Sequence, residues 1–237
     1  MKHSNKNWFA RLHEKLKHFF RENEFLLLLI VLLAFLLVPA FIINRPIKDI
    51  TIYSLLIMVL IIGVYELADS KRSFLPGVLL AILTMGLLSI NFSSNEDLVF
   101  VLRMGCLTSF FGLLTIHVMI RLIKAKTINT NIIYAAVNGY VLIGLIGGMC
   151  FRFINHFYPH SFMFANGLKP RIDDLTYFSF ITLSTLGYGD ITPTSAPGKS
   201  LAIFISIIGQ MYTAIVIGII IGKYILNKTG GPFDKSQ

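Results

Sequence analysis

The sequence has few charged residues, and this scarcity limits the kinds of protein it can encode. Charged side chains make up 14% of the 237 residues, whereas soluble domains carry about 25%. Hydrophobic residues make up 55%, and the mean hydropathy is +0.72. Such a composition has too little polar surface for a soluble domain, and it also excludes a disordered chain and collagen. It predicts an all-α membrane protein that crosses the bilayer several times.

Cysteines and acidic residues are also scarce. The two cysteines, Cys106 and Cys150, lie in apolar segments without a CxxC or His-rich spacing, so neither a disulfide framework nor a zinc site is expected. Only 12 acidic residues stand against 21 basic ones, which gives a net charge of +9. We interpret this excess as the basic bias of cytoplasmic loops rather than as nucleic-acid binding, because no basic stripe alternates with aromatic residues.

Six long apolar segments make up most of the remaining sequence. Each is close to or longer than the ~20 residues that span a bilayer, so each is expected to be a transmembrane helix. They cover residues 25–43, 51–68, 75–92, 98–120, 132–154 and 200–226. With six spans both termini lie on one side of the membrane. Fourteen basic residues on that side against six on the other predict that it is the cytoplasmic side.

The two ends of the chain differ in character. Residues 1–24 carry aromatic and leucine residues at helical spacing from Trp8 to Phe20, with basic residues largely off that stripe. This pattern predicts an amphipathic helix in the cytoplasmic membrane interface; a solvated helix packed on a partner is the alternative. Residues 227–237 are expected to be a short cytoplasmic tail, too short for a small-molecule ligand domain at that end.

The segment between the last two spans contains a helix that is too short to cross a bilayer. Pro170, Asp173 and Asp174 mark its start, because proline and acidic residues favour the first turn. Residues 173–184 are apolar enough to enter the membrane, and re-entrant backbone persists only inside protein or beside a water-filled cavity. The carboxyl end of this helix carries a partial negative charge, which stabilises a cation.

Five residues with alternating glycines, Thr185 to Gly189, follow this helix. Glycine adopts positive φ angles at little steric cost. Alternating backbone handedness would turn successive carbonyl groups to one side, and a ring of such strands would replace the water shell of a cation, with the Thr185 hydroxyl as the innermost ring. One chain supplies only one strand, so several subunits must surround a shared axis.

The run Thr185-Leu186-Gly187-Tyr188-Gly189-Asp190 resembles the selectivity filter of potassium channels, in which carbonyl oxygens replace the hydration shell of K+. The resemblance implies a homotetramer in the cell membrane, with K+ as the permeant ion and with no cofactor or enzyme activity. The resemblance is close over residues 173–193 and looser over 132–226. It divides the chain into a four-helix transmembrane domain of unknown role, 25–123, and a pore domain, 131–226.

Residues around the motif take further roles from this resemblance. Tyr177 and Phe178 fall where the family often has aromatic residues that brace the filter tyrosine, and Asp190 matches the acid just outside the filter. Leu186 stands where valine is usual, and its side chain is expected to face away from the axis. Ile181 stands where some members have a bracing carboxylate, so that support is absent here.

The last span contains candidates for a hinge and a gate. Gly209 resembles the hinge glycine of the family, although close packing explains a glycine in a membrane helix equally well. Gln210 and Thr213 are candidate cavity residues. Three isoleucines recur every four residues and so share a face that closes by dewetting in a tetramer. They are Ile217, Ile221 and Ile225.

The fourth span lacks the charge array of a voltage sensor. Arg103 and Arg121 are the only basic residues at every third position along it, so steep voltage gating is not expected. Glu66 and Asp69 are candidates to pair with Arg103, or with Lys71 and Arg72; interfacial acids at the end of a span are an alternative that explains them at least as well.

Two smaller features complete the interpretation of the pore segment. The glycines of the fifth span, which lie between Gly139 and Gly148, are expected to pack against the last span. His156 and His160 are expected to be solvated residues of an outer loop.

Other functions remain possible on the sequence alone. A weakly selective cation channel has the same plan, although Tyr188 argues against it. A non-conducting accessory subunit is a further alternative. A transporter or membrane enzyme is disfavoured, because the spans contain no paired carboxylates, nucleophile–base set or metal cluster.

Overall fold

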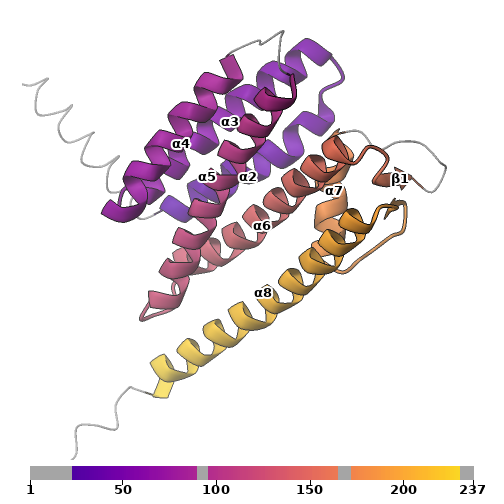
Figure 1. The fold of residues 1–237 in the computed structure, drawn as a ribbon. Helices are drawn as coiled ribbons and strands as arrows, with labels where there is room; N and C mark the ends of the chain where they lie inside the picture. The colour runs from indigo at the N-terminus through magenta and orange to yellow at the C-terminus, as the bar shows by residue number, and fades with distance from the viewer. Residues whose placement is uncertain (1–22, 90–95, 165–171, 230–237) are drawn as a thin grey trace, which may run out of the picture.

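The computed structural model describes residues 23–89, 96–164 and 172–229, which form a bundle of helices with one short sheet (Figure 1). In chain order these elements are α2 (Glu24–Leu37), η1 (Val38–Phe41), α3 (Arg45–Leu67), α4 (Lys71–Ser89), α5 (Glu96–Lys124), α6 (Thr130–Phe157), β1 (Phe162–Phe164), α7 (Ile172–Leu183), β2 (Ile191–Pro193) and α8 (Ala196–Thr229). The expected amphipathic helix in residues 1–24 and the tail in 227–237 lie almost wholly outside the described residues.

Six helices within the described ranges are long and apolar enough to cross a membrane, which confirms the prediction of an all-α, multi-span membrane protein. They are α2 with η1, α3, α4, α5, α6 and α8. The helix starts differ from the expected ones in one instructive place. The span expected over residues 51–68 begins earlier, at Arg45, and Pro46 fits the first turn of α3 because proline has no amide hydrogen bond to lose there.

The four helices α2 to α5 pack together, and α6 lies between them and α8 (Figure 1). Fully buried Phe25, Leu28, Phe110 and Leu114 form part of the core of this packing. The Asn138 amide donates a 2.7 Å hydrogen bond to the Phe25 carbonyl oxygen, so it fastens α6 to the start of α2. The helix α6 is the most buried of the spans, whereas α8 is one of the least buried.

The short helix α7 is held between α6 and α8. Gly144 and Gly148 let it approach α6, because a β-carbon at either position would meet the Phe180 ring or the Thr176 backbone of α7. The expectation that the α6 glycines pack on α8 is therefore correct for Gly139, which meets Tyr212, but wrong for these two. Sequence spacing alone did not reveal that α7 inserts between the two long helices.

The strands β1 and β2 pair antiparallel, with Met163 opposite Thr192. The sequence did not predict them, because three-residue strands show no usable alternation. Their position is informative, because β2 begins at Ile191, directly after the filter-like run. The pairing therefore fixes the end of that run to the segment that follows α6.

Candidate functional site: a pore loop

The filter-like run leaves the carboxyl end of α7 in an orderly way. The amides of Ser184 and Thr185 donate to carbonyl oxygens of the last turn of α7, at 2.9 and 3.1 Å. The Gly187 amide then reaches back to the Ile181 carbonyl oxygen at 3.1 Å. These bonds use donors near the start of the run, so its first residues are held against the helix end.

The backbone of the run alternates in handedness. Thr185, Gly187 and Gly189 have φ angles of 60°, 52° and 76°, whereas no positive φ is recorded for Leu186 or Tyr188. Two of these three positions are glycines, which adopt positive φ readily. Thr185 is different, because a β-branched residue at positive φ is uncommon and costs conformational energy. Such strain is typical of functional sites, where the surrounding structure fixes the conformation.

The same run is open on one side. Residues 184–189 are exposed in the single chain, with Leu186 at 59% and Tyr188 at 69%. A β-carbon at Gly187 or Gly189 would have no heavy atom within 4 Å among the described residues. The described residues therefore leave an apolar leucine and a tyrosine uncovered beside a strained backbone.

A hydrogen bond braces the outer end of the run. The Tyr177 hydroxyl donates to Asp190 Oδ2 at 2.8 Å. This bond to a carboxylate, with smaller contributions from desolvation and nearby acidic groups, raises the pKa of Tyr177 from 10 to about 12. The phenol therefore stays protonated and able to donate at physiological pH. Two of the three residues expected to support the filter are thus in contact.

Phe178 and Ile181 face the interior of the chain. Phe178 packs against Phe151 and Phe162, with ring centroids 4.9 and 5.5 Å apart. Ile181 is buried in the same cluster, at the position where some relatives have a bracing carboxylate. Apolar packing therefore replaces a polar brace on this side of α7, and the aromatic cluster fixes α7 to α6 and β1.

Gly209 lies where α8 crosses the end of α7. A β-carbon at this position would fall onto the carbonyl oxygen of Leu183, so the two backbones touch. The structure thus gives Gly209 a close-packing role next to the filter-like run. Thr213, one turn further along, donates from its hydroxyl to the Gly209 carbonyl oxygen at 2.9 Å.

The candidate cavity and gate residues share one open face of α8. Their spacing of three or four residues places them on one side of the helix. They are Gln210, Thr213, Ile217, Ile221 and Ile225, and all five are exposed. The isoleucines are each about half exposed, at 51%, 52% and 52%. Within the described part of the chain nothing covers this face of α8 or the filter-like run.

Known proteins resemble the part of the chain that carries this arrangement. Residues 139–225, from α6 to α8, match the family model described as "Ion channel". A relative from Caenorhabditis elegans, described as small conductance calcium-activated potassium channel-like protein 3, is 31% identical over 70 residues, which are 30% of this chain. Residues 139–225 are thus similar to ion channels, and the resemblance of this part of the chain to potassium channels is confirmed.

The extent of these similarities is limited. The aligned residues cover 9% of the Caenorhabditis elegans relative, so this chain spans less than a tenth of that protein. No solved structure matches the chain. Within the chain, the family match begins at residue 139 and therefore leaves the helices α2 to α5 outside it.

The helix α8 contacts the end of the helix α5 through one lysine. The Lys223 ammonium group donates to the carbonyl oxygens of Leu122, Ile123 and Ala125 at 2.9, 2.7 and 2.6 Å. The last carbonyls of a helix have no partner within the helix, and a cation there also complements the helix dipole. This contact was not predicted from the sequence, because a lysine at the end of a span usually anchors the helix in the membrane interface.

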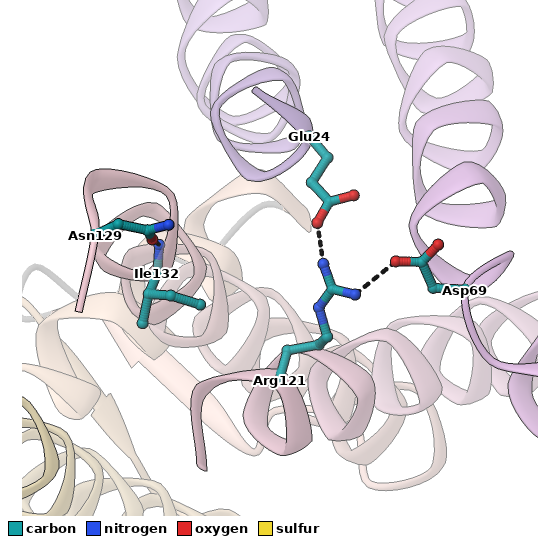
Figure 2. A network of polar contacts seen from close by, with 5 residues as sticks. All are labelled: Glu24, Asp69, Arg121, Asn129 and Ile132. Atoms are coloured by element: carbon teal, nitrogen blue, oxygen red, sulfur yellow. Dashed lines mark hydrogen bonds and ion pairs between the residues drawn. The ribbon is translucent and has the colours of Figure 1, made fainter. Parts of the chain in front are cut away.

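Arg121 joins the ends of three segments at the same end of the bundle (Figure 2). It forms ion pairs with Glu24 of α2 and, at 2.5 Å, with Asp69 next to the end of α3. Close by, the Asn129 side chain accepts a 3.0 Å bond from the Ile132 amide and caps the start of α6. Arg103, Lys71 and Arg72 were only candidate partners for Asp69, and its ion pair in the structure is with Arg121, which the rotation of α5 brings to it.

Two other charged groups also differ from expectation. Arg103 Nε donates to the Leu87 carbonyl oxygen at 2.8 Å, so it binds the end of α4. His156 is not a solvated loop residue: it belongs to α6, contacts Asp97 at 2.9 Å and stacks on Phe100 with centroids 4.0 Å apart. The region that resembled a loop in the sequence is thus partly the last turn of α6, which continues to Phe157.

Proposed function

We propose that the chain is a subunit of a homotetrameric, potassium-selective channel that conducts K+ passively through Thr185–Gly189. The observation that carries this proposal is the alternation of positive φ at residues 185, 187 and 189 in an uncovered run between two membrane helices. In four copies around an axis, such backbones present rings of carbonyl oxygens that substitute for water around a dehydrated cation.

Four-fold assembly explains why two surfaces of the chain are uncovered. The exposed side of the filter-like run and the exposed face of α8 belong to the same channel domain. A shared axis would bring copies of both surfaces together and would enclose the cavity lined by Gln210 and Thr213. The ring of Ile217, Ile221 and Ile225 then closes the inner end of the pore by dewetting.

We further propose that the channel is not steeply voltage-gated. A charge that crosses a 100 mV field supplies only ~2.3 kcal/mol, so a steep response needs several mobile charges. The helix α5 has Arg103 and Arg121, and Arg121 is held by Glu24 and Asp69. The basic bias of the loops supports an orientation with both termini in the cytoplasm, which places Arg121 and Lys223 on the inner side.

Reconstitution tests the proposal directly. The purified chain in liposomes should pass K+ much faster than Na+, and a bi-ionic reversal potential should report the selectivity. Equal K+ and Na+ permeability would indicate the weakly selective channel. An assembled protein that passes neither ion would indicate an accessory subunit, and flux that requires a proton or sodium gradient would indicate a transporter.

Removing the brace at Asp190 should weaken selectivity. In Tyr177→Phe the donor to Asp190 is lost, and we expect the K+/Na+ permeability ratio to fall about threefold; the partial exposure of the pair limits the effect. The pH dependence has a defined sign. Because the pKa is raised from 10 to about 12, the bond is complete below pH 10 and is lost as the pH rises through about 12.

Tyr224→Phe is the matched control, because Tyr224 is also an exposed tyrosine, at 62%, but lies near the carboxyl end of α8. An unchanged ratio in Tyr177→Phe, or an equal fall in Tyr224→Phe, would contradict a role for the brace.

A polar side chain at the proposed gate should raise resting conductance. Ile221→Ser replaces an apolar wall with a hydrated one, so the closed pore no longer dewets. We expect a rise of about tenfold or more in K+ leak at rest, since tenfold corresponds to only about 1.4 kcal/mol in the wetting equilibrium. Single-channel recording measures this as open probability.

Ile215→Ser serves as the comparison, because Ile215 is 49% exposed but lies on a different side of α8. If intact tetramers of Ile221→Ser leak no more than those of Ile215→Ser, the gate lies elsewhere.

A further inference from the structure

A cavity of about 1140 Å³ lies between the α2–α5 helices and the pore helix α7. Its walls come from every helix from α2 to α7, including η1. It is slightly larger than the roughly 300–1,000 Å³ of sites for small molecules. It is separate from the filter-like run, which contributes none of its lining residues. The family match provides no role for it, because most of its lining belongs to helices outside residues 139–225.

The cavity combines an apolar floor with basic groups. Buried Leu56, Leu107 and Leu145 line it, with exposed fractions of 4%, 7% and 3%. Three basic side chains line it too, against one acidic side chain. The basic residues are Lys48, Arg103 and Arg152, and the acidic one is Asp49. Three basic side chains from three different helices thus meet at this one cavity.

The basic groups lie toward the same end of the helix bundle. Lys48 is in the first turn of α3, Arg103 is in the second or third turn of α5, and Arg152 is in the second-last turn of α6. Since α3 and α5 run in one direction and α6 runs in the other, these positions belong to the same end of the bundle. That end is opposite to Arg121, which is in the last turn of α5. The basic groups are therefore near the level of lipid headgroups, and the leucines extend from there toward the bilayer centre.

We propose that this cavity binds an anionic lipid whose headgroup contacts Lys48, Arg103 and Arg152 and whose acyl chain covers the apolar floor. Basic pockets between transmembrane helices bind acidic headgroups on the cytoplasmic side of membranes. In the orientation proposed above this cavity opens toward the outer leaflet, where the same chemistry applies, because guanidinium groups bind phosphate through paired hydrogen bonds. A free inorganic anion would contact only the basic groups and would leave the leucines that line the cavity uncovered. The chemistry of the whole cavity thus favours an amphiphile over a soluble ion.

The bound lipid would contact the pore helix. Thr176, Tyr177 and Phe180 of α7 line the cavity, and Tyr177 donates to Asp190 at 2.8 Å. An occupant therefore packs against the helix that carries the filter brace. If the chain conducts K+ as proposed above, occupancy changes the K+ flux; this consequence rests on the proposed function, whereas the binding itself does not.

Binding is tested with the purified full chain in detergent and two single-chain probes that differ in charge. We expect oleoyl lysophosphatidic acid to bind at one site per chain. Oleoyl lysophosphatidylcholine, which has the same acyl chain, should bind at least about tenfold more weakly. Inorganic phosphate should not displace the first probe. Equal binding of both probes, or displacement by phosphate, would overturn the proposal.

Variants locate the site. Arg103→Gln and Arg152→Gln should each weaken lysophosphatidic acid about fivefold, the loss expected for one basic contact to an anionic lipid. Arg45→Gln removes the same charge one turn from Lys48, at an exposed residue outside the cavity, and should leave binding unchanged. Unchanged binding in both arginine variants, or an equal loss in Arg45→Gln, would contradict the site.

A second type of variant covers the case in which the arginine variants do not fold. Met104→Trp fills part of the cavity without removing a charge and should also reduce binding; full binding by a folded Met104→Trp protein would refute the assignment. In liposomes, lysophosphatidic acid should alter the K+ flux of the native chain, and Arg152→Gln should need about fivefold more of the lipid for the same effect. If the lipid binds but K+ flux does not change, only the proposed effect of the lipid on conduction is overturned. If no preparation conducts K+, only the proposed function is overturned.

Discussion

Gly187→Ala should abolish K+ flux while leaving the fold intact. Gly187 has a φ of 52°, and a β-carbon there would meet no heavy atom within 4 Å among the described residues. The substitution therefore causes no collision within the chain, and its cost is conformational, about 1–2 kcal/mol for an L-residue in the left-handed region. Alanine favours negative φ, which would rotate the adjoining peptide groups and remove carbonyl oxygens from the pore axis.

Ion flux from liposomes measures this effect, and we expect a loss of K+ flux of about tenfold or more, since 1.4 kcal/mol in the population of the conducting backbone is already tenfold. Gly218→Ala is the matched control. It is also a glycine with open space around it, but it lies in the middle of the α8 helix and has no positive φ. If Gly187→Ala conducts like Gly218→Ala, the alternating run is not the conducting element.

Gly209→Ala should destabilise the protein rather than merely slow its gating. Its β-carbon would collide with the Leu183 carbonyl oxygen, which belongs to the backbone at the end of α7 and has little freedom to move. Overpacking of this kind costs about 1–3 kcal/mol, and relief of the clash would push α8 away from the filter-like run. Thermal unfolding should therefore shift to lower temperature, and K+ flux should fall with it.

A hinge gives a different result, and the two roles are separable. If Gly209 acts only as a flexible point in α8, alanine there leaves thermal stability unchanged and alters open probability alone. Gly222→Ala is a suitable comparison, because no neighbour lies within 4 Å of its position among the described residues. A normal unfolding temperature for Gly209→Ala would contradict the packing role.

The sequence predicted the helices well because their signals are local. Apolar length defines each span, and the acids near Pro170 mark the start of α7, which begins at Ile172. The open face of α8 was also predictable, since residues three and four apart must lie together on a helix. The alternation of φ followed from the spacing of Gly187 and Gly189, although Thr185 adopts the same conformation without being glycine.

The contacts between elements were not predictable in the same way. The partner of Arg121 depends on how α5 is rotated against α2 and α3, and no local pattern encodes that rotation. The same reason applies to the basic groups of the cavity, which are 49 or more residues apart in sequence. The pairing of β1 with β2 was missed because each strand has only three residues.

The contact of Lys223 with the end of α5 has a mechanical consequence. One ammonium group holds three peptide oxygens, so α8 cannot swing outward at that level without either pulling the α5–α6 connection along or leaving those oxygens without a donor. Lys223 lies between Ile221 and Ile225, within one turn of each. If Ile221 and Ile225 belong to the gate proposed above, this contact links the end of α5 to that level of α8, in addition to the packing of α6 against both α5 and α8.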